Sequence, residues 1–338
     1  MRAQRVIHAG ARFRSSGPGF RQQRGVAMLV AILLVALATI LAAGIAFKSA
    51  MAARRGTATL AFDESMLVAE AAEALAAYAL REDLKSSKGG DDNPAEQWGQ
   101  PLGPVEVVPG ILLEAYVSDE TGRFNLNRLV ATDATGQEKV DENALHDLEH
   151  LMENVGIEPK WASLIADWID PDSLPLQDGA EDSAYAAQNP PYRAPNTFIT
   201  SASELLALPG FGRDRYLRLA PFVTALPRDA LINTCSAPGM VLDSLIGEGH
   251  KEFSLDLARL NKNRESGCFP TPDVYKASFG TSESQQWQNL QARIGKTSSY
   301  FRLTSIVTIG SADFALYSLL QRDQTGQVHV LMRSFTPD

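Results

Sequence analysis

Six carboxylates lie close together in one short stretch of the chain, and carboxylate oxygens are ligands that calcium prefers. They are Asp167, Asp170, Asp172, Asp178, Glu181 and Asp182. Pro171 and Gly179 keep this stretch irregular, so that a loop could collect the side chains around an ion. The pattern of the stretch as a whole is not that of an EF-hand loop. A solvated acidic loop explains the same residues, so both interpretations remain open at this point.

A second group of residues has the pattern of a zinc-protease helix. His146, Glu149 and His150 match H-x-x-E-H, and two histidines four residues apart on a helix can both reach a zinc ion. No third ligand can be identified, and the acidic helix around them favours ordinary surface residues. The remaining histidines form no Ser-His-Asp set. We therefore predict that the chain is not an enzyme and keep a membrane-anchored zinc peptidase as an alternative.

An uncharged apolar segment near the N-terminus must position everything that follows it. It runs from Val26 to Phe47, which is 22 residues, or about 33 Å of helix, and this length can cross the hydrocarbon core of a bilayer. Residues 1–25 carry six arginines and no acid, and basic flanks stay in the cytoplasm. We predict one membrane span, with the chain after Phe47 on the far side.

The junction in front of this segment has three interpretations. A secretory signal peptide has a shorter apolar region of about 7–15 residues, whereas a plain membrane anchor fits the length. The pair Arg24-Gly25 resembles a class III signal, the type found on type IV pilin-like proteins, in which a prepilin peptidase cuts after the glycine. That resemblance implies that Gly25 ends a leader peptide and that Val26 begins the mature chain.

The charge of the chain argues against nucleic acid as a partner. The net charge is −9, and it becomes −15 when the six arginines of residues 1–25 are removed. Between Asp91 and Ala184 there are 21 acids and 4 bases, and such a surface repels anionic polymers. The glycine-rich segment Pro209–Gly212 resembles the hairpin of helix-hairpin-helix DNA-binding modules. We interpret it as a turn that packs two helices, and a DNA-uptake pilin is the alternative.

The two cysteines, Cys235 and Cys268, both follow the apolar segment. The predicted topology places them outside the cytoplasm, where disulfides form. A bridge would close a loop of about 34 residues and contribute about 3–4 kcal/mol in the chain-entropy model. Two unpaired thiols are the other possibility, and we favour the bridge.

The hydrophobic pattern predicts an α+β chain. From Lys48 to about Leu84 little interrupts a helix, and we expect an apolar face at helical spacing. This face comprises Leu60, Leu67, Ala71, Ala74 and Tyr78. Strands are predicted at 111–117, 300–308, 314–320 and 328–335, and short helices at 143–154, 159–169, 201–208, 214–223 and 238–245. Strands therefore bracket a helical middle, in which an Asn-containing motif recurs at 124–127 and 231–234.

Several motifs of this chain resemble one family, the K-type minor pseudopilins of bacterial type II secretion systems. The resemblance rests on the block from Ala166 to Asp172 and on the acidic run from Asp178 to Tyr185. It also rests on Leu208–Gly212 and on the strand entry at 299–301. It covers nearly the whole chain from Gly25 onward. It implies a pilin-like fold, a long N-terminal helix plus a small antiparallel sheet, with a large inserted helical domain of SAM-like units.

The resemblance implies the following division of the chain. The predicted parts are a cleaved leader (1–25), a membrane helix (26–47), a periplasmic helix with the first strand (48–118), a first helical unit (119–228), a second helical unit (229–297) and the C-terminal strands (298–338).

The resemblance also implies a function without catalysis. The protein would lie in the inner membrane with its globular part in the periplasm, and Val26 would be methylated. With minor pseudopilins of the I and J types, and with further contacts to the H type and the major pseudopilin G, it would cap the tip of a pseudopilus. Family members bind calcium at the acidic run, which favours calcium over the solvated loop. Asp170, Asp172, Glu181 and Asp182 are then the preferred ligands, while Asp167 could instead cap a helix or face solvent.

Two positions depart from common patterns. Most pilin-like subunits carry a glutamate four residues after the mature N-terminal residue, and this glutamate is thought to pair with the α-amino group of the subunit ahead. In this chain the position is occupied by the uncharged Val30. K-type subunits share this absence of a carboxylate, which the resemblance explains by a place at the filament tip. The alternative is that valine at this position simply favours residence in the membrane.

The second helical unit of the family usually opens Ile-Asn-x-Asn-Thr-Ala, and here Cys235 replaces the second asparagine. A disulfide to Cys268 could take over the structural role of that amide.

Overall fold

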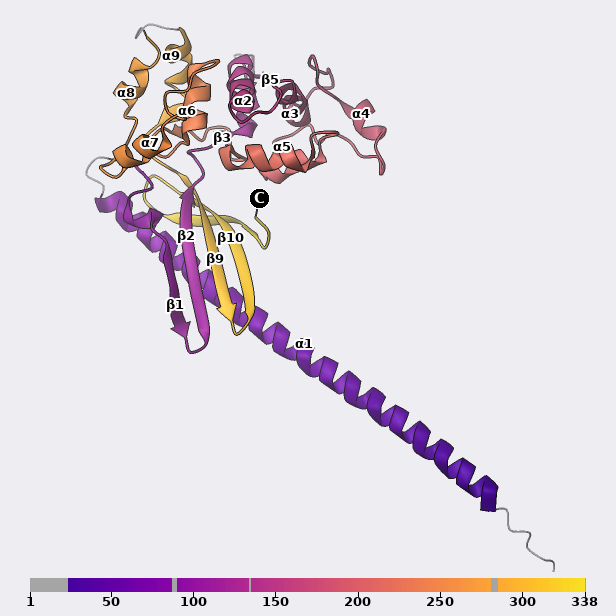
Figure 1. Ribbon diagram of the computed structural model, residues 1–338. Helices are drawn as coiled ribbons and strands as arrows, with labels where there is room; N and C mark the ends of the chain where they lie inside the picture. Colours follow the sequence, from indigo (N-terminus) through magenta and orange to yellow (C-terminus); the bar gives the residue numbers. More distant parts are fainter. Residues whose placement is uncertain (1–23, 87–89, 134, 281–284, 338) are drawn as a thin grey trace, which may run out of the picture. The chain divides into compact units, whose positions relative to one another are not determined.

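The computed structural model describes residues 24–86, 90–133, 135–280 and 285–337. The chain divides into two compact units, residues 1–60 and residues 61–338, and helix α1 (Arg24–Ser86) contributes to both (Figure 1). The predicted leader lies almost entirely outside the described residues.

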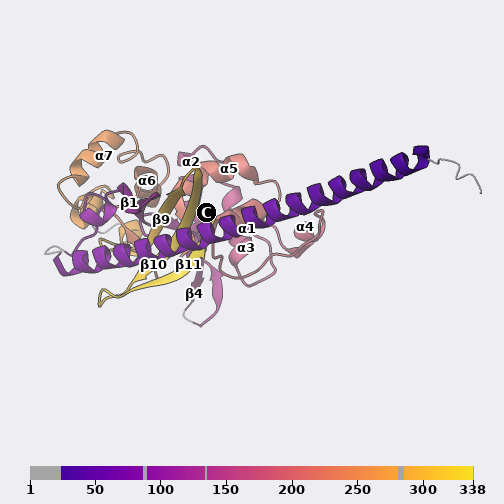
Figure 2. The same ribbon diagram turned by 90° about the horizontal axis from the view of Figure 1, so that it is seen from below.

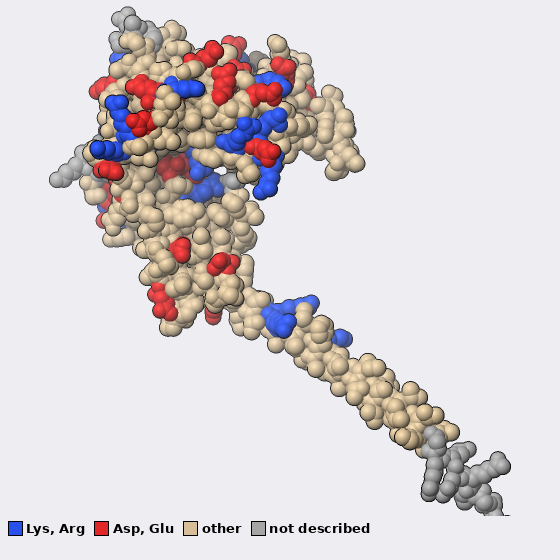
Figure 3. Space-filling view, in the orientation of Figure 1, with Lys and Arg blue, Asp and Glu red and all other residues tan. Residues whose placement is uncertain are grey.

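The first unit contains the apolar part of α1. Every residue from Val26 to Phe47 is exposed, and no charged surface covers this stretch in the space-filling view (Figure 3). Among the described residues, this helix alone is long and apolar enough to cross a membrane. A continuous apolar surface of this length is stable in lipid or against other apolar helices, rather than in water.

A five-stranded antiparallel sheet forms the base of the second unit. Its strands are β1 (Leu102–Val108), β2 (Ile111–Asp119), β9 (Tyr300–Ile309), β10 (Ala312–Arg322) and β11 (Val328–Ser334), and they lie in the order β1-β2-β9-β10-β11. The four predicted strands are present. Strand β1 was not predicted, because all its residues are exposed and no alternation of buried and exposed positions marks it. Among the described strands it pairs with β2 alone, so it forms an edge of the sheet.

The part of α1 beyond Ala61 lies along one face of this sheet (Figures 1 and 2). The residues that pack there are Ala69, Ala72, Ala76 and Leu80, together with Leu113, Leu303, Val307 and Leu316 of the sheet. The predicted packing face was wrong: Leu67 is 67% exposed and Tyr78 is 54% exposed, and Leu60, Ala71 and Ala74 are also exposed. The helix is apolar on two sides, and the side with smaller residues packs against the sheet because it allows a closer approach.

A buried ion pair fixes the same helix to the sheet. Glu73 is 5% exposed and accepts hydrogen bonds from Arg333 Nε and Nη2 at 2.9 and 2.7 Å. The hydroxyl of Ser318 donates to the same carboxylate at 2.6 Å. A carboxylate with three donors can stay ionised in an apolar contact, so this contact sets the register between α1 and strands β10 and β11.

The chain between β2 and β9 forms a helical insertion with its own core. The first part contains β3 (Phe124–Asn125), η2 (Leu126–Leu129), β4 (Val130–Thr132), β5 (Glu138–Val140), α2 (Glu142–Asn154), α3 (Trp161–Ile169), α4 (Asp182–Ala186), η3 (Ala202–Ala207), α5 (Gly212–Leu219), η4 (Ala220–Phe222) and β6 (Val223–Thr224). The second part contains β7 (Ile232–Asn233), α6 (Gly239–Ile246), α7 (Leu257–Arg264), α8 (Pro272–Ala277), α9 (Gln285–Leu290) and β8 (Ile294–Gly295). Leu148, Ile165, Phe211, Leu242 and Tyr275 are completely or almost completely buried in one shared core.

The recurring asparagine motif has the same structural role in both parts. Strand β3 pairs in parallel with β6, and β7 pairs in parallel with β8. Asn125 accepts from the backbone N–H of Leu226 at 3.0 Å and donates to the Pro227 carbonyl. Asn233 accepts from the N–H of Cys235 at 2.9 Å and donates to the Asp92 carbonyl. Each asparagine thus ties the start of a helical part to a distant segment.

Candidate metal centre

Three carboxylates of the acidic run come together after helix α3. Asp170 caps the C-terminal end of α3, Asp172 follows in the loop, and Glu181 precedes α4. One oxygen of each lies within 4.8 Å of the others. Pro171 ends the helical path, and the chain then returns through Gly179 to place Glu181 opposite the helix end.

Two of these three carboxylates are buried and have oxygens without a hydrogen-bond partner among the described residues. Asp170 is 2% exposed and Glu181 is 7% exposed. Oδ1 of Asp170 and both side-chain oxygens of Glu181 have no hydrogen-bond partner in the described part of the chain. Such acceptors are costly to bury unless a cation or donor compensates them. This arrangement therefore suits a hard divalent cation, for which carboxylate oxygens are the usual ligands.

The electrostatics of the cluster agree with this interpretation. Burial, and next the charge of Asp172, raises the pKa of Asp170 to about 7. Burial is also the main cause of the raised pKa of Glu181, and the amide of Asn196 acts in the opposite direction. Both shifts show that the ionised carboxylates lack sufficient positive charge nearby.

Asp167 organises the loop rather than joining this group. Its side chain accepts from the N–H of Leu176, with oxygens 3.2 and 3.1 Å away, and the residue is 0% exposed. Gly179 packs directly on the carboxylate, so closely that a Cβ atom there would overlap it. Burial raises the pKa of Asp167 to about 6, and the Leu176 N–H acts in the opposite direction. This glycine is required for close approach and not for an unusual φ angle.

Two other predicted ligands lie outside the group of three. Asp178 is exposed, and its φ of 66° places it in a left-handed turn. Oδ1 of Asp182 accepts a hydrogen bond from the N–H of Ala194 at 3.2 Å, and Oδ2 of Asp182 lies 3.9 Å from Nε of Arg193. The structure thus brings together Asp170, Asp172 and Glu181, while Asp182 fixes the following connection.

One residue at this site, Asn196, was not predicted from the sequence. Its Nδ2 donates to the carbonyl of Asp172 at 2.6 Å, and its Oδ1 is buried without a partner in the described part of the chain. Its φ of 46° is unusual for a residue with a side chain. An amide oxygen is a further ligand type for calcium. The positive φ could not be read from the sequence, and Asn196 has no charge to mark it.

The zinc-protease pattern forms no metal site in the described residues. Nδ1 of His146 lies 2.8 Å from Oε2 of Glu149, whereas Nδ1 of His150 faces the Ser244 carbonyl at 3.3 Å. No histidine occurs in any of the metal-competent groups among the residues that the structure describes. The pattern therefore belongs to a helix surface.

The glycine-rich hairpin packs helices together. Gly210 and Gly212 have φ angles of 78° and 76°, and the turn between them places Phe211 in the core. Arg215 Nη1 donates to the carbonyls of Gly210 and Phe211, and its guanidinium stacks on Trp161. These contacts account for the motif as a structural turn.

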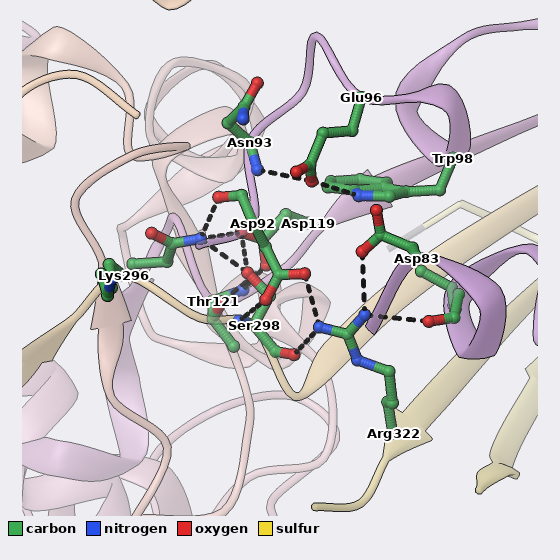
Figure 4. Close-up of polar contacts among 12 residues, drawn as sticks. Asp83, Asp92, Asn93, Glu96, Trp98, Asp119, Thr121, Lys296, Ser298 and Arg322 are labelled. Atoms are coloured by element: carbon green, nitrogen blue, oxygen red, sulfur yellow. Dashed lines mark hydrogen bonds and ion pairs between the residues drawn. The ribbon is translucent and has the colours of Figure 1, made fainter. Parts of the chain in front are cut away.

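A second polar cluster joins the sheet to the helical insertion (Figure 4). Arg322 pairs with Asp92 at 2.5 Å and with Asp83 at 3.3 Å. The buried Asp119 carboxylate accepts from Ser298 and from Ser236. Burial raises the pKa of Asp119, and those hydroxyl donors act in the opposite direction.

A disulfide joins Cys235 and Cys268, whose Cα atoms are 4.6 Å apart. Cys235 lies two residues after Asn233, at the position where the family pattern has its second asparagine. The disulfide ties this segment to the loop after α7, which adds a covalent link beside the polar cluster.

The predicted processing positions lie at the start of α1. Gly25 and Val26 are both helical, and Val30 is 48% exposed on the same apolar surface. The first turn of α1 carries no acidic residue.

A long apolar helix continuing onto an antiparallel sheet, with a helical insertion between two sheet strands, defines a pilin-like subunit. A crystal structure with the same fold is that of the GspK-GspI-GspJ complex of the enterotoxigenic Escherichia coli type 2 secretion system. The match has a TM-score of 0.71 and 22% identity, and it covers 84% of this chain and 100% of that one. The expected fold class, a pilin-like fold with a helical insertion, is confirmed.

Sequence comparison identifies the family. A family model described as type II secretion system (T2SS), protein K, matches residues 122–228. The type II secretion system protein K of Pseudomonas aeruginosa is 32% identical, over 93% of each chain. That of Pectobacterium carotovorum subsp. carotovorum is 30% identical over 93% of this chain and 97% of that protein. The chain belongs to the type II secretion system protein K family, the K-type minor pseudopilins, which confirms the resemblance.

Proposed function

We propose that this minor pseudopilin caps the tip of a periplasmic pseudopilus, together with minor pseudopilins of the I and J types. The solved neighbour that shares its fold was crystallised in a complex with GspI and GspJ. The helical insertion supports a terminal place, because it forms a second core beside the pilin-like sheet and would obstruct repeated stacking.

The observation that carries this proposal is the uncharged residue Val30 in the first turns of the mature helix. A carboxylate at this position would be costly in an apolar environment unless the subunit ahead supplied a positive charge. A subunit at the tip has no subunit ahead of it. Valine avoids the unpaired charge there.

The location of the protein in isolated pseudopili tests the proposal. Gold-labelled antibody against the helical insertion should mark one end of each pseudopilus. The matched control labels the major pseudopilin G, which should be marked along the length. Labels of the K-type subunit distributed along the shaft would show that it is an ordinary filament subunit.

Processing by prepilin peptidase and a single pass through the inner membrane form part of the same proposal. The apolar stretch from Val26 to Phe47 and the basic N-terminal flank support an orientation with the sheet and insertion in the periplasm. The mass of membrane-extracted protein should correspond to a chain that starts at Val26 and carries one methyl group. An uncut chain, or one starting near Ala53, would contradict this processing.

The proposal includes a calcium ion held by Asp170, Asp172 and Glu181, with the amide oxygen of Asn196 as an additional ligand. The fit rests on the unpartnered buried oxygens of Asp170, Glu181 and Asn196. Bound calcium would neutralise the carboxylates and fix the loop between α3 and α4. It would supply structural stability here, since the described residues give no catalytic arrangement around it.

Calcium titration of the chelator-treated full-length protein in detergent tests this site. Asp170→Asn and Glu181→Gln should each weaken calcium binding at least about 10-fold. Asp178→Asn is the matched control, because this carboxylate lies in the same loop but outside the group of three, and its affinity should equal that of the wild type. A wild-type protein that binds no calcium would refute the metal site and leave the tip assignment intact.

A further inference from the structure

Three basic residues follow the apolar part of α1 and have no acidic residue near them on the helix. Lys48, Arg54 and Arg55 are exposed, and basic side chains mark α1 directly beyond its uncharged stretch (Figure 3). The first acidic residue of the whole chain is Asp63. Helical ion pairs form between residues three or four positions apart, so these three charges lack a counter-ion on their own helix.

The three bases lie on one side of the helix. At about 100° per residue, Lys48 and Arg55 point in nearly the same direction, and Arg54 is about 100° away from Arg55. All three therefore lie within a sector of about 120°. The residues between Lys48 and Arg54 carry no charge. Such a concentrated positive surface attracts anions from one side of the helix.

The length of the apolar stretch sets the depth of these charges in a membrane. Val26 to Phe47 is about 33 Å of helix, and the hydrocarbon core is about 30 Å thick. The next residue, Lys48, therefore lies at the level of the lipid headgroups. Arg54 and Arg55 lie about 9–11 Å further along the axis. Their long side chains lean back toward the bilayer, because each Cα–Cβ bond of a helix tilts toward its N-terminus.

The orientation of the chain in the membrane does not account for these charges. Basic residues favour the cytoplasmic flank of a membrane helix, and the six arginines of residues 1–25 already supply that signal. Three bases just beyond Phe47 act against it. Charges that oppose the orientation signal indicate a separate role at the far surface of the membrane.

Lipid phosphate groups match the chemistry of this basic surface. A guanidinium group donates two parallel N–H groups to the oxygens of one phosphate, and a lysine ammonium contacts a phosphate as a point charge. The aliphatic stems of both side chains can lie along apolar surface while the charged ends reach the polar layer. A lipid with a net negative charge is favoured over a zwitterionic lipid, whose own cation would be repelled.

We propose that Lys48, Arg54 and Arg55 bind the phosphate groups of anionic phospholipids at the periplasmic surface of the inner membrane. The inference rests on the proposed function, because it uses the proposed single pass through that membrane. It adds a lipid preference and a defined depth at the point where α1 leaves the bilayer.

Lipid retention by the mature protein tests the assignment. Protein that starts at Val26 is reconstituted into nanodiscs of equal parts phosphatidylglycerol and phosphatidylcholine and is then extracted in detergent. Mass spectrometry measures the lipids that stay bound. The wild type should retain phosphatidylglycerol at least about 10-fold over phosphatidylcholine, since each basic residue near an anionic surface contributes about 5-fold.

A triple variant removes the charges and keeps the helix. Lys48→Gln, Arg54→Gln, Arg55→Gln should retain both lipids equally. Glutamine is a good helix former and the three positions are exposed, so the circular dichroism and the melting temperature should match those of the wild type.

The matched control removes three exposed bases from the helical insertion. Lys251→Gln, Arg259→Gln, Lys262→Gln changes the net charge by the same amount and should keep the preference for phosphatidylglycerol. An uncut chain leaves the comparison valid, because both triple variants keep the six arginines of residues 1–25.

The alternatives give different results. Equal retention of both lipids by the wild type, or an unchanged preference in the Lys48 triple variant, would overturn the lipid site and leave the proposed function intact. Loss of the preference in the insertion variant as well would show a general effect of net charge. Release of the lipid by inorganic phosphate would identify a site for free anions instead. A wild-type protein that stays soluble without detergent would refute the proposed membrane pass as well.

Discussion

The contact between Gly179 and Asp167 allows a quantitative test of how the acidic loop is built. A Cβ atom at position 179 would overlap the Asp167 carboxylate, so Gly179→Ala must displace a buried side chain. That carboxylate accepts from the Leu176 N–H at 3.1 and 3.2 Å. Because a hydrogen bond to a charged group contributes about 1.5–3 kcal/mol and overpacking costs about 1–3 kcal/mol, we expect Gly179→Ala to lower the free energy of unfolding by about 2–4 kcal/mol.

The same geometry predicts a strong coupling between the two positions. Asp167→Ala leaves the Leu176 N–H without its acceptor, which costs about 1–3 kcal/mol. In the double variant, the alanine at 179 occupies space that the carboxylate has vacated. The double variant should therefore be about as stable as Asp167→Ala alone, and the summed single effects should exceed the measured one by about 2–4 kcal/mol, the whole effect of Gly179→Ala.

Urea unfolding of the chelator-treated full-length protein in detergent measures these energies. Trp168 is 6% exposed and its ring lies 5.0 Å from that of Tyr185, so its fluorescence reports on this part of the insertion. Gly295→Ala is the matched control, because a Cβ there would meet Leu231 at an ordinary 3.5 Å, and it should change stability by less than about 0.5 kcal/mol. Additive effects of Gly179→Ala and Asp167→Ala, within about 0.5 kcal/mol, would show that the two side chains do not compete for the same space.

Three further predictions follow from buried charges and the disulfide. Glu73→Gln should lower the free energy of unfolding by about 1.5–3 kcal/mol, because the bidentate bond to the half-exposed Arg333 is lost; urea unfolding that shows less than 0.5 kcal/mol, on the order of a surface change, would contradict it. Burial raises the pKa of Asp147 to about 6, so this group stabilises the fold below about pH 4 and loses that contribution as the pH rises to about 6. From pH 4.5 to pH 7 the Asp147 carboxyl should remove about 2 kcal/mol from the free energy of unfolding of the wild type, and this contribution should be absent in Asp147→Asn. The same change in the free energy of unfolding between the two pH values in both proteins would contradict this prediction. Reduction of the Cys235–Cys268 bridge should lower the free energy of unfolding by about 3–4 kcal/mol for a loop of about 34 residues; equal unfolding midpoints with and without reductant would show that the bridge contributes nothing.

The sequence predicted the parts of the fold whose physical signal is local. Strand β2 alternates buried Ile111 and Leu113 with exposed Leu112, and the apolar helix has no charge from Val26 to Phe47. Strand β1 gave no such signal, because an edge strand with all residues exposed needs no alternation. The sheet-facing side of α1 was assigned wrongly because two sides of the helix are apolar, and only the shape of the sheet decides between them.

The candidate metal site was predictable in composition but not in geometry. Carboxylates near Pro171 indicated a cation-binding loop, and Asp170 and Glu181 do converge. Asp167 is also a carboxylate, but it accepts a hydrogen bond from the backbone N–H of Leu176 instead of joining the group. Asn196 comes from a connection whose path is set by packing on the insertion, so its position depends on tertiary structure rather than on local pattern.

The two acidic clusters of this chain deal with buried charge in different ways, and the difference indicates what each can bind. At Asp170 and Glu181, three buried oxygens have no hydrogen-bond partner among the described residues, and a compact cation such as the proposed calcium ion could contact several of them at once. At Asp83 and Glu96 the protein supplies Arg322, Trp98 and backbone N–H groups, and one open hollow remains beside them. The first cluster therefore leaves acceptors for a bound cation, whereas in the second cluster the chain's own cation and N–H groups already contact the carboxylates.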